Sequence, residues 1–328
     1  MSDLHTWRFV QGNLQAGKTV ILLVVAESRP PAPGRAGFKM AVSADGNAEG
    51  TIGGGTVERE MADLAREKIR AGDTKPLVRT LAHRYPPEVM GPAKEYPSGM
   101  ICGGGQTVVI WTVRRSELPV ISRIVEDLES GTPFRFFLTF AGIGHGPVDG
   151  PPGTRFSNPT EDIFRFTEDV SPPTVYIIGG GHVALALSEV LSRLDLRIVV
   201  LDNRPDAPTM AKNRFAHQKK TIDYIDVADE IPDGPDNYIV IMTPSHQHDE
   251  EVLGRLIRKE SAYLGMMASP PKARKIFANL KNAGISEESL QKVRAPIGLP
   301  IHSHTAPEIA VSIAAELISV KNGKDKQP

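Results

Sequence analysis

The segment 175–202 constrains the fold most, because it joins a short apolar strand, a glycine turn and a helix in one unit. The apolar run VYII at 175–178 precedes a Gly-x-Gly-x-x-Ala pattern made by Gly179, Gly181 and Ala184. In this pattern the first glycine permits a tight turn and the second lets a pyrophosphate approach the backbone. The small third residue lets the following helix pack closely on the strand. The segment therefore predicts a nucleotide-type turn.

The next apolar run, 198–201, ends at Asp202, a little over 20 residues after the glycine turn. An acidic side chain at this place accepts hydrogen bonds from an adenosine ribose. Arg204 follows, where its side chain is suited to stacking on adenine or to contacting a 2′-phosphate. We expect dinucleotide or related nucleotide binding here, and an empty or degenerate site on the same fold is the alternative.

Apolar runs alternate with helical stretches through the rest of this half, at 175–178, 183–194, 198–201, 238–242, 250–258, 263–267 and 272–283. Strand and helix in alternation indicate a parallel sheet with right-handed crossovers. We predict a Rossmann-like, doubly wound parallel sheet. Thr305 and Glu308 have the spacing of a capping box, which places the start of a last helix between them.

The N-terminal half is also predicted to be α/β. Strands are expected at 19–27, 107–113 and 134–140, with helices at 56–71 and 117–129 and a hairpin turn at Asp45-Gly46. Glycine and proline are dense from 142 to 173, which favours a connecting segment. We therefore expect an N-terminal cofactor-binding domain over 1–145, a linker over 146–173 and a Rossmann-like domain over 174–328.

Composition excludes several classes of protein. The 38 basic and 39 acidic residues give a net charge of −1, so no extended basic surface is available for nucleic acid or an anionic membrane. A single cysteine excludes an intrachain disulfide and a multi-thiolate zinc site. The apolar run at 20–26 is far shorter than a membrane-spanning helix. With no secretory signal at the start, we expect a cytoplasmic protein.

A second glycine loop, Gly53, Gly54 and Gly55, stands directly before the helix expected at 56–71. Backbone amides ahead of a helix N-terminus attract phosphate. Glu58 lies in the first helical turn, where a carboxylate stabilises the helix dipole. Contact between Glu58 and a ligand is an equally open interpretation.

A third motif sets the one thiol of the chain, Cys102, before Gly103 and Gly104. A free cysteine is most often a small core residue. Its place after a proline-rich loop and beside glycine amides favours instead a thiolate that ligates a soft metal or carries sulfur.

His246 and His248 follow the strand expected at 238–242, at the edge where doubly wound folds bind ligands. Two histidines at this spacing are able to share a metal. No third ligand is evident, and polarity near the nucleotide crevice is the favoured interpretation.

The three loops, in this order, resemble the XdhC/CoxI family of accessory factors for xanthine dehydrogenase and related molybdenum hydroxylases. The resemblance covers nearly the whole chain, and it departs from the family pattern at Ala268, Pro270-Pro271 and 302–304. The matching segments are 28–40 (SRPPAPGRAGFKM), 50–58 (GTIGGGTVE), 100–104 (MICGG), 177–184 (IIGGGHVA), 200–204 (VLDNR), 263–269 (YLGMMAS) and 296–313.

The resemblance implies a protein that binds the molybdenum cofactor, a molybdopterin, protects it and helps a sulfurated form reach a hydroxylase apoenzyme, in partnership with a cysteine desulfurase. It implies that Gly53–Gly55 hold the anionic end while Cys102 approaches the molybdenum. Such a factor is a non-enzymatic maturation protein. We also expect a homodimer, because a large oxygen-sensitive ligand is best shielded between surfaces.

Two alternatives stay open. One is an NAD(P)-dependent oxidoreductase that uses Gly179, Gly181 and Asp202, with His246 or His248 as acid or base. The other is a scaffold that contacts the desulfurase and the hydroxylase without holding a cofactor. An ordinary dehydrogenase has no evident need for two triple-glycine loops and a lone cysteine, which favours the carrier.

Overall fold

The strand expected at 19–27 is β1 (Val20–Arg29), and it is buried on both faces. Leu22 lies in one hydrophobic core and its neighbour Leu23 in another. A strand covered on both sides needs a continuous apolar run, which explains the sequence at 20–26. The structure is a computed structural model that describes residues 3–82, 95–97, 104–149, 153–160, 163–194 and 196–323.

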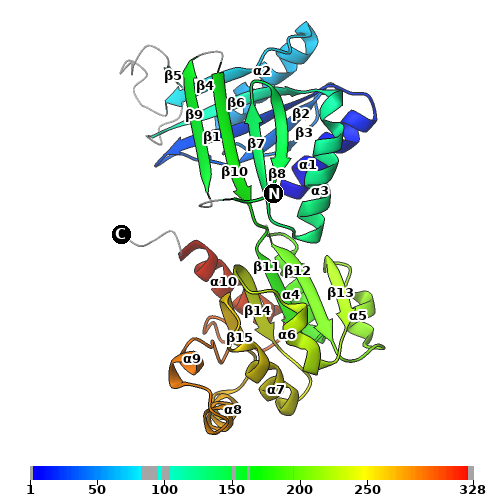
Figure 1. The fold of residues 1–328 in the computed structure, drawn as a ribbon, viewed down its shortest axis with the longest axis vertical. Coiled ribbons are helices and arrows are strands. Elements are labelled where there is room, and N and C mark those ends of the chain that lie inside the picture. The colour runs from blue at the N-terminus through cyan, green and yellow to red at the C-terminus, as the bar shows by residue number, and fades with distance from the viewer. Residues whose placement is uncertain are drawn as a thin grey trace. The chain divides into compact units, whose positions relative to one another are not determined.

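The chain divides into two compact units, Met1–Ser171 and Pro172–Pro328, called unit 1 and unit 2 below. In unit 1, β1 belongs to a six-stranded sheet with the order β3-β2-β1-β6-β4-β5 (Figure 1). Only β4 and β5 pair in parallel. The other strands are β2 (Lys39–Ser43), β3 (Ala48–Gly50), β4 (Leu77–Ala82), β5 (Glu95–Pro97) and β6 (Gly105–Val113).

Helix α2 (Gly55–Ala71) covers one face of this sheet, with Val57, Met61 and Ala65 in the shared core. The other face packs against α1 (Asp3–Gln15), α3 (Leu118–Ser130) and a second sheet. Both tryptophans of the chain, Trp7 and Trp111, are buried in this second core. The short helix η1 (Arg115–Glu117) leads into α3.

The second sheet of unit 1 is antiparallel and corrects the expected linker at 146–173. Its strand order is β8-β7-β10-β9, with β7 (Phe134–Thr139), β8 (Gly142–Gly146), β9 (Thr154–Thr160) and β10 (Ile163–Val170). Phe164 and Phe166 of β10 point into the core, while Arg165 between them is exposed. In the sequence, glycine and proline at the loops obscured this period-two pattern, so the linker prediction was wrong and the segment belongs to unit 1.

Unit 2 contains the predicted parallel sheet. Its strand order is β13-β12-β11-β14-β15, and all four pairings are parallel. The order reverses direction at β11, as in a doubly wound Rossmann fold. The strands are β11 (Thr174–Ile178), β12 (Arg197–Asp202), β13 (Gln218–Thr221), β14 (Gly234–Ile241) and β15 (Ser261–Met266).

Helices cover both faces of this sheet (Figure 1). One face packs against α4 (His182–Leu191), α5 (Pro208–Lys212) and α10 (Ala306–Gly323). The other packs against η2 (Tyr224–Asp226), α6 (Val227–Glu230), α7 (His246–Leu256), α8 (Pro270–Asn282) and α9 (Glu287–Gln291).

Several local predictions are confirmed. The turn between β2 and β3 contains Gly46, whose amide donates to Ser43 O at 2.9 Å. The Thr305 amide donates to Glu308 Oε2 at 3.0 Å and the Glu308 amide to Thr305 Oγ1 at 3.4 Å, which is the predicted capping box. In the described part of the chain, no helix is both long and apolar enough to cross a membrane.

Candidate functional site

The glycine loop of unit 1 lies between β3 and α2. Gly53 and Gly54 have φ values of 122° and 77°, in the region that favours glycine. Glu58, in the first turn of α2, reaches back to this loop. Its Oε2 accepts hydrogen bonds from the amides of Ile52 and Gly54, both at 3.0 Å, and from Thr51 Oγ1 at 2.5 Å. Amides expected to hold an anion are thus bound by a carboxylate of the chain itself.

Two other motifs of the sequence pack against this loop. A Cβ added to Gly53 would lie 2.5 Å from the Gly34 amide nitrogen, so the 28–40 segment is in close contact there. A Cβ added to Gly104 would overlap the carbonyl oxygen of Arg29. The Gln106 side-chain amide donates to Ile52 O at 3.2 Å. The structure therefore brings the 28–40 segment, the 50–58 loop and residues 104–106 together at one end of the first sheet.

Cys102 and Gly103 lie outside the described residues, so the predicted role of the thiol stays a prediction. Gly104 is described and has a φ of 69°. In the described part of the chain, no cluster of three or more His, Cys, Asp or Glu side chains is suited to holding a metal ion.

The convergence of motifs offers both a donor and an acceptor to a ligand. An added Cβ at Gly54, the residue that caps α2, would meet nothing within 4 Å, so the backbone there faces open space. Gln106 is 1% exposed, and its Oε1 is buried without a hydrogen-bond partner among the described residues. Leaving such an acceptor unpaired costs about 1–3 kcal/mol. A ligand with an anionic end and N–H donors, such as a phosphorylated pterin, fits this pair of features.

The glycine turn of unit 2 adopts the predicted conformation. Gly179 has a φ of 106°, and a Cβ on it would overlap the carbonyl oxygen of Met242 at the end of β14. Gly181 caps α4 and faces open space. Ala184 is fully buried between helix and sheet, which confirms the packing reason for a small residue.

Asp202 is fully buried, and its carboxylate is occupied by groups of the chain itself. It accepts from the Gly180 amide at 2.5 Å and from the Arg204 amide at 2.8 Å. The Arg204 guanidinium adds Nε at 2.9 Å and Nη2 at 2.7 Å. Burial acts to raise the pKa of Asp202, but the hydrogen bonds from Arg204 and Gly180 outweigh it and hold the pKa below its ordinary value.

Three residues at the same sheet edge were missed by the sequence prediction. Asp249, in the first turn of α7, is fully buried. Its Oδ1 accepts from the Thr243 amide at 2.9 Å and from Thr243 Oγ1 at 2.7 Å, and its Oδ2 from Lys272 Nζ at 2.6 Å. A threonine after β14 and an acidic residue in the next helical turn were the available signal. The lysine comes from another strand–helix unit.

The two histidines of this edge differ in their surroundings. His246 is exposed at the start of α7. The His248 ring packs edgewise on the Tyr224 ring, with centroids 5.2 Å apart. The pair does not point to a shared metal, in line with the favoured interpretation of loop polarity.

The Asp202 contacts predict an acid-dependent stability for unit 2. Because the folded pKa lies below the unfolded value of about 3.9, ionised Asp202 stabilises the fold above that pH. This contribution disappears as the pH falls through the folded pKa. Asp202→Asn should therefore lower the melting temperature of unit 2 at pH 7, with a smaller difference at about pH 3. Unit 2 holds no tryptophan, so circular dichroism follows its transition. An equal difference at both pH values would contradict the assignment.

Comparison with known proteins places the chain in a family. Residues 175–317 match the XdhC Rossmann domain, and residues 13–81 match the XdhC and CoxI family. A crystal structure described as a xanthine dehydrogenase from Bacillus halodurans superposes with a TM-score of 0.74. The match covers 99% of this chain and 97% of that one, at 21% identity, and supports the fold.

Three curated relatives have 23–24% identity to the chain. Uncharacterized protein YqeB of Escherichia coli K12 matches over 91% of this chain and 43% of its own length. A protein of Bacillus subtilis named as a probable xanthine dehydrogenase component matches over 48% and 46%. The molybdenum cofactor insertion chaperone PaoD of E. coli matches over 96% and 87%. The chain thus spans less than half the length of the first two. By its two family matches, it belongs to the XdhC and CoxI family.

Proposed function

We propose that this protein is a carrier that binds the molybdenum cofactor as cargo and delivers it to a xanthine dehydrogenase-type hydroxylase. The observation that carries the proposal is the convergence of three motifs in unit 1. The 28–40 segment, the 50–58 loop and residues 104–106 meet before the N-terminus of α2. The name of the relative PaoD, a molybdenum cofactor insertion chaperone, supports the same role.

The chain's own groups divide the work of holding this cargo. The backbone amides of Ile52 and Gly54 receive the terminal phosphate or nucleotide in exchange for the Glu58 carboxylate. Gln106 Oε1 accepts from a pterin N–H. Cys102, assigned from the sequence, supplies a thiolate toward the molybdenum, whose terminal oxo or sulfido ligand is the group that sulfuration exchanges.

The partners follow from the proposed cargo. The apoenzyme of a molybdenum hydroxylase receives the cofactor, and a cysteine desulfurase supplies the sulfur. A homodimer would shield the cofactor between two copies, and we propose this state for the loaded protein.

The NAD(P)-dependent oxidoreductase alternative has less support. A dinucleotide ribose needs the Asp202 carboxylate, which already accepts hydrogen bonds from Gly180 and Arg204. Occupation of the crevice would require Arg204, which is 45% exposed, to leave its ion pair. Unit 2 therefore serves the carrier better as a structural or partner-contacting domain.

The test is anaerobic co-expression with the molybdenum cofactor pathway, for the wild type and for Cys102→Ser. The expected result is pterin and molybdenum equimolar with the wild-type chain, measured by fluorescence of the oxidised pterin and by elemental analysis. The variant should lose the metal or its terminal sulfur. Absence of pterin from both proteins together with tight NAD(H) binding would favour the oxidoreductase. Full function in Cys102→Ser would favour the scaffold.

A further inference from the structure

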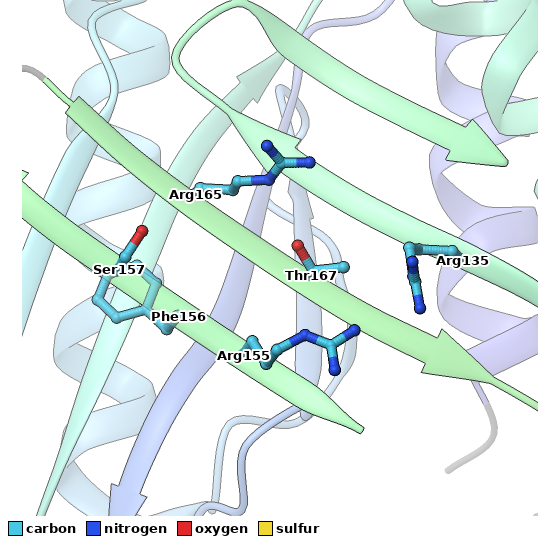
Figure 2. Close-up of a pocket in the computed structure, with 6 residues that line it drawn as sticks. All are labelled: Arg135, Arg155, Phe156, Ser157, Arg165 and Thr167. Atoms are coloured by element: carbon cyan, nitrogen blue, oxygen red, sulfur yellow. The ribbon is translucent and has the colours of Figure 1, made fainter. Parts of the chain in front are cut away.

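The outer face of the second sheet in unit 1 holds a pocket of about 270 Å³. Figure 2 shows side chains from three adjacent strands around it. They are Arg135 of β7, Arg155, Phe156 and Ser157 of β9, and Arg165 and Thr167 of β10. Strand register explains the grouping, since Arg165 pairs with Ser157 and Thr167 with Arg155. Three guanidinium groups thus surround two hydroxyl groups on one solvent-facing surface.

The three arginines are not equally engaged. Asp169, whose side chain is 5% exposed, accepts from Arg135 Nε at 2.6 Å and Nη2 at 3.1 Å, and lies 3.5 Å from Arg155 Nη2. Arg165 is exposed and makes no ion pair with any described residue. The pocket therefore has two arginines fixed by a buried carboxylate and a third whose fork is available.

Asp149 shows where an external oxyanion binds. Its carboxylate accepts from Arg135 Nη1, the nitrogen that Asp169 leaves unused. The Asp149 side chain is 78% exposed, in contrast to the buried Asp169. An exposed carboxylate exchanges readily with an incoming anion, because it regains water when it leaves. Without Asp149, three guanidinium charges face one carboxylate, which leaves two positive charges for a dianion.

We propose that this pocket binds a small molecule through a phosphoryl group. Arginine forks bind phosphate oxygens in pairs, and the hydroxyl groups of Ser157 and Thr167 add neutral donors between them. A volume of about 270 Å³ lies just below the usual range for small-molecule sites, about 300–1,000 Å³. The volume suits a phosphate with a compact organic body, such as a nucleoside monophosphate.

This site is independent of the proposed carrier site. The inner face of the second sheet, with Phe164 and Phe166, packs on one face of the first sheet. Helix α2 and its glycine loop belong to the core on the opposite face of that first sheet. Phosphate binding at the arginine pocket therefore involves none of the residues assigned to the cofactor.

The experiment is calorimetric titration of the full chain with AMP and with inorganic phosphate. Arg165→Met removes the free guanidinium without touching the Asp169 contacts, and should weaken AMP binding by about tenfold or more. Asp149→Asn removes the competing carboxylate charge and should tighten binding. The matched control is Arg123→Met, an arginine 57% exposed on α3, which should bind AMP as the wild type does. Cys102→Ser should also leave AMP binding unchanged, which separates this site from the carrier role.

Three results would overturn the proposal. The first is wild-type affinity in Arg165→Met, which would place any phosphate at a glycine loop instead. The second is equal affinity for malonate, a dicarboxylate, which would remove the preference for a phosphoryl group. The third is the absence of saturable binding by either phosphate probe, including the case in which an acidic peptide binds instead.

Discussion

Gly53→Ala is expected to reduce the molybdenum cofactor retained by the chain by more than about tenfold. The added Cβ would lie 2.5 Å from the Gly34 nitrogen and 2.8 Å from the Pro33 carbonyl carbon, and backbone atoms cannot move aside as a flexible side chain does. Overpacking costs about 1–3 kcal/mol, and a positive φ adds about 1–2 kcal/mol for a residue with a Cβ. Because about 1.4 kcal/mol is tenfold in affinity, displacement of the loop reaches this loss.

The matched control is Gly72→Ala, at the other end of α2. Gly72 also has a positive φ, 64°, but an added Cβ would meet nothing within 4 Å. This variant should lose only the conformational term in stability, about 1–2 kcal/mol, and retain the cofactor. Pterin fluorescence and molybdenum content after anaerobic purification measure both variants. Equal retention in the two variants would show that close packing of Gly53 on Gly34 does not shape the binding site.

Lys39→Met should lower the free energy of unfolding of unit 1 by about 3–5 kcal/mol. Lys39 is 1% exposed at its side chain, and its Nζ lies 2.8 Å from Asp3 Oδ2, 2.7 Å from Glu168 Oε2 and 2.8 Å from Gly37 O. Burial acts to lower the pKa of Lys39, but the two carboxylates outweigh it and leave the pKa above its ordinary value. The lysine is therefore charged at neutral pH, and its loss leaves two carboxylates without a cation.

Urea unfolding followed by tryptophan fluorescence reports this change selectively, because Trp7 and Trp111 are both in unit 1. Lys18→Met is the matched control, since the Lys18 side chain is 44% exposed in its ion pair and should change stability by about 0–1 kcal/mol. Adding Glu168→Gln to Lys39→Met should restore part of the loss. A loss in Lys39→Met no larger than in the control would argue against a stabilising role.

Elements with a strong local pattern were predictable. The buried strand β1 follows from an uninterrupted apolar run, and the start of α10 follows from Thr305 and Glu308. Helix α1 was missed although Trp7, Val10 and Leu14 have helical spacing, because the remaining residues are polar. In general, periodicity identifies an element when its flanking residues agree with it.

Contacts between distant segments were beyond the sequence. The glycine motifs were visible, but their meeting depends on the register of β1 against β6, which brings Arg29 opposite Gly105. Similarly, the ion pair of Asp249 with Lys272 joins two successive strand–helix units. The pairing of Arg135 with Asp169 depends on strands in a segment that composition marked as a linker. Site residues were thus predictable as motifs, and their partners required the fold.

The Glu58 carboxylate has a kinetic consequence for a protein that must give its ligand away. When a bound anion departs from the loop, the amides of Ile52 and Gly54 regain an acceptor within the same turn of chain. Each buried donor left unpaired would otherwise oppose dissociation by about 1–3 kcal/mol. Exchange between an internal and an external anion shortens residence time without weakening recognition, and so suits handover to a partner over permanent storage.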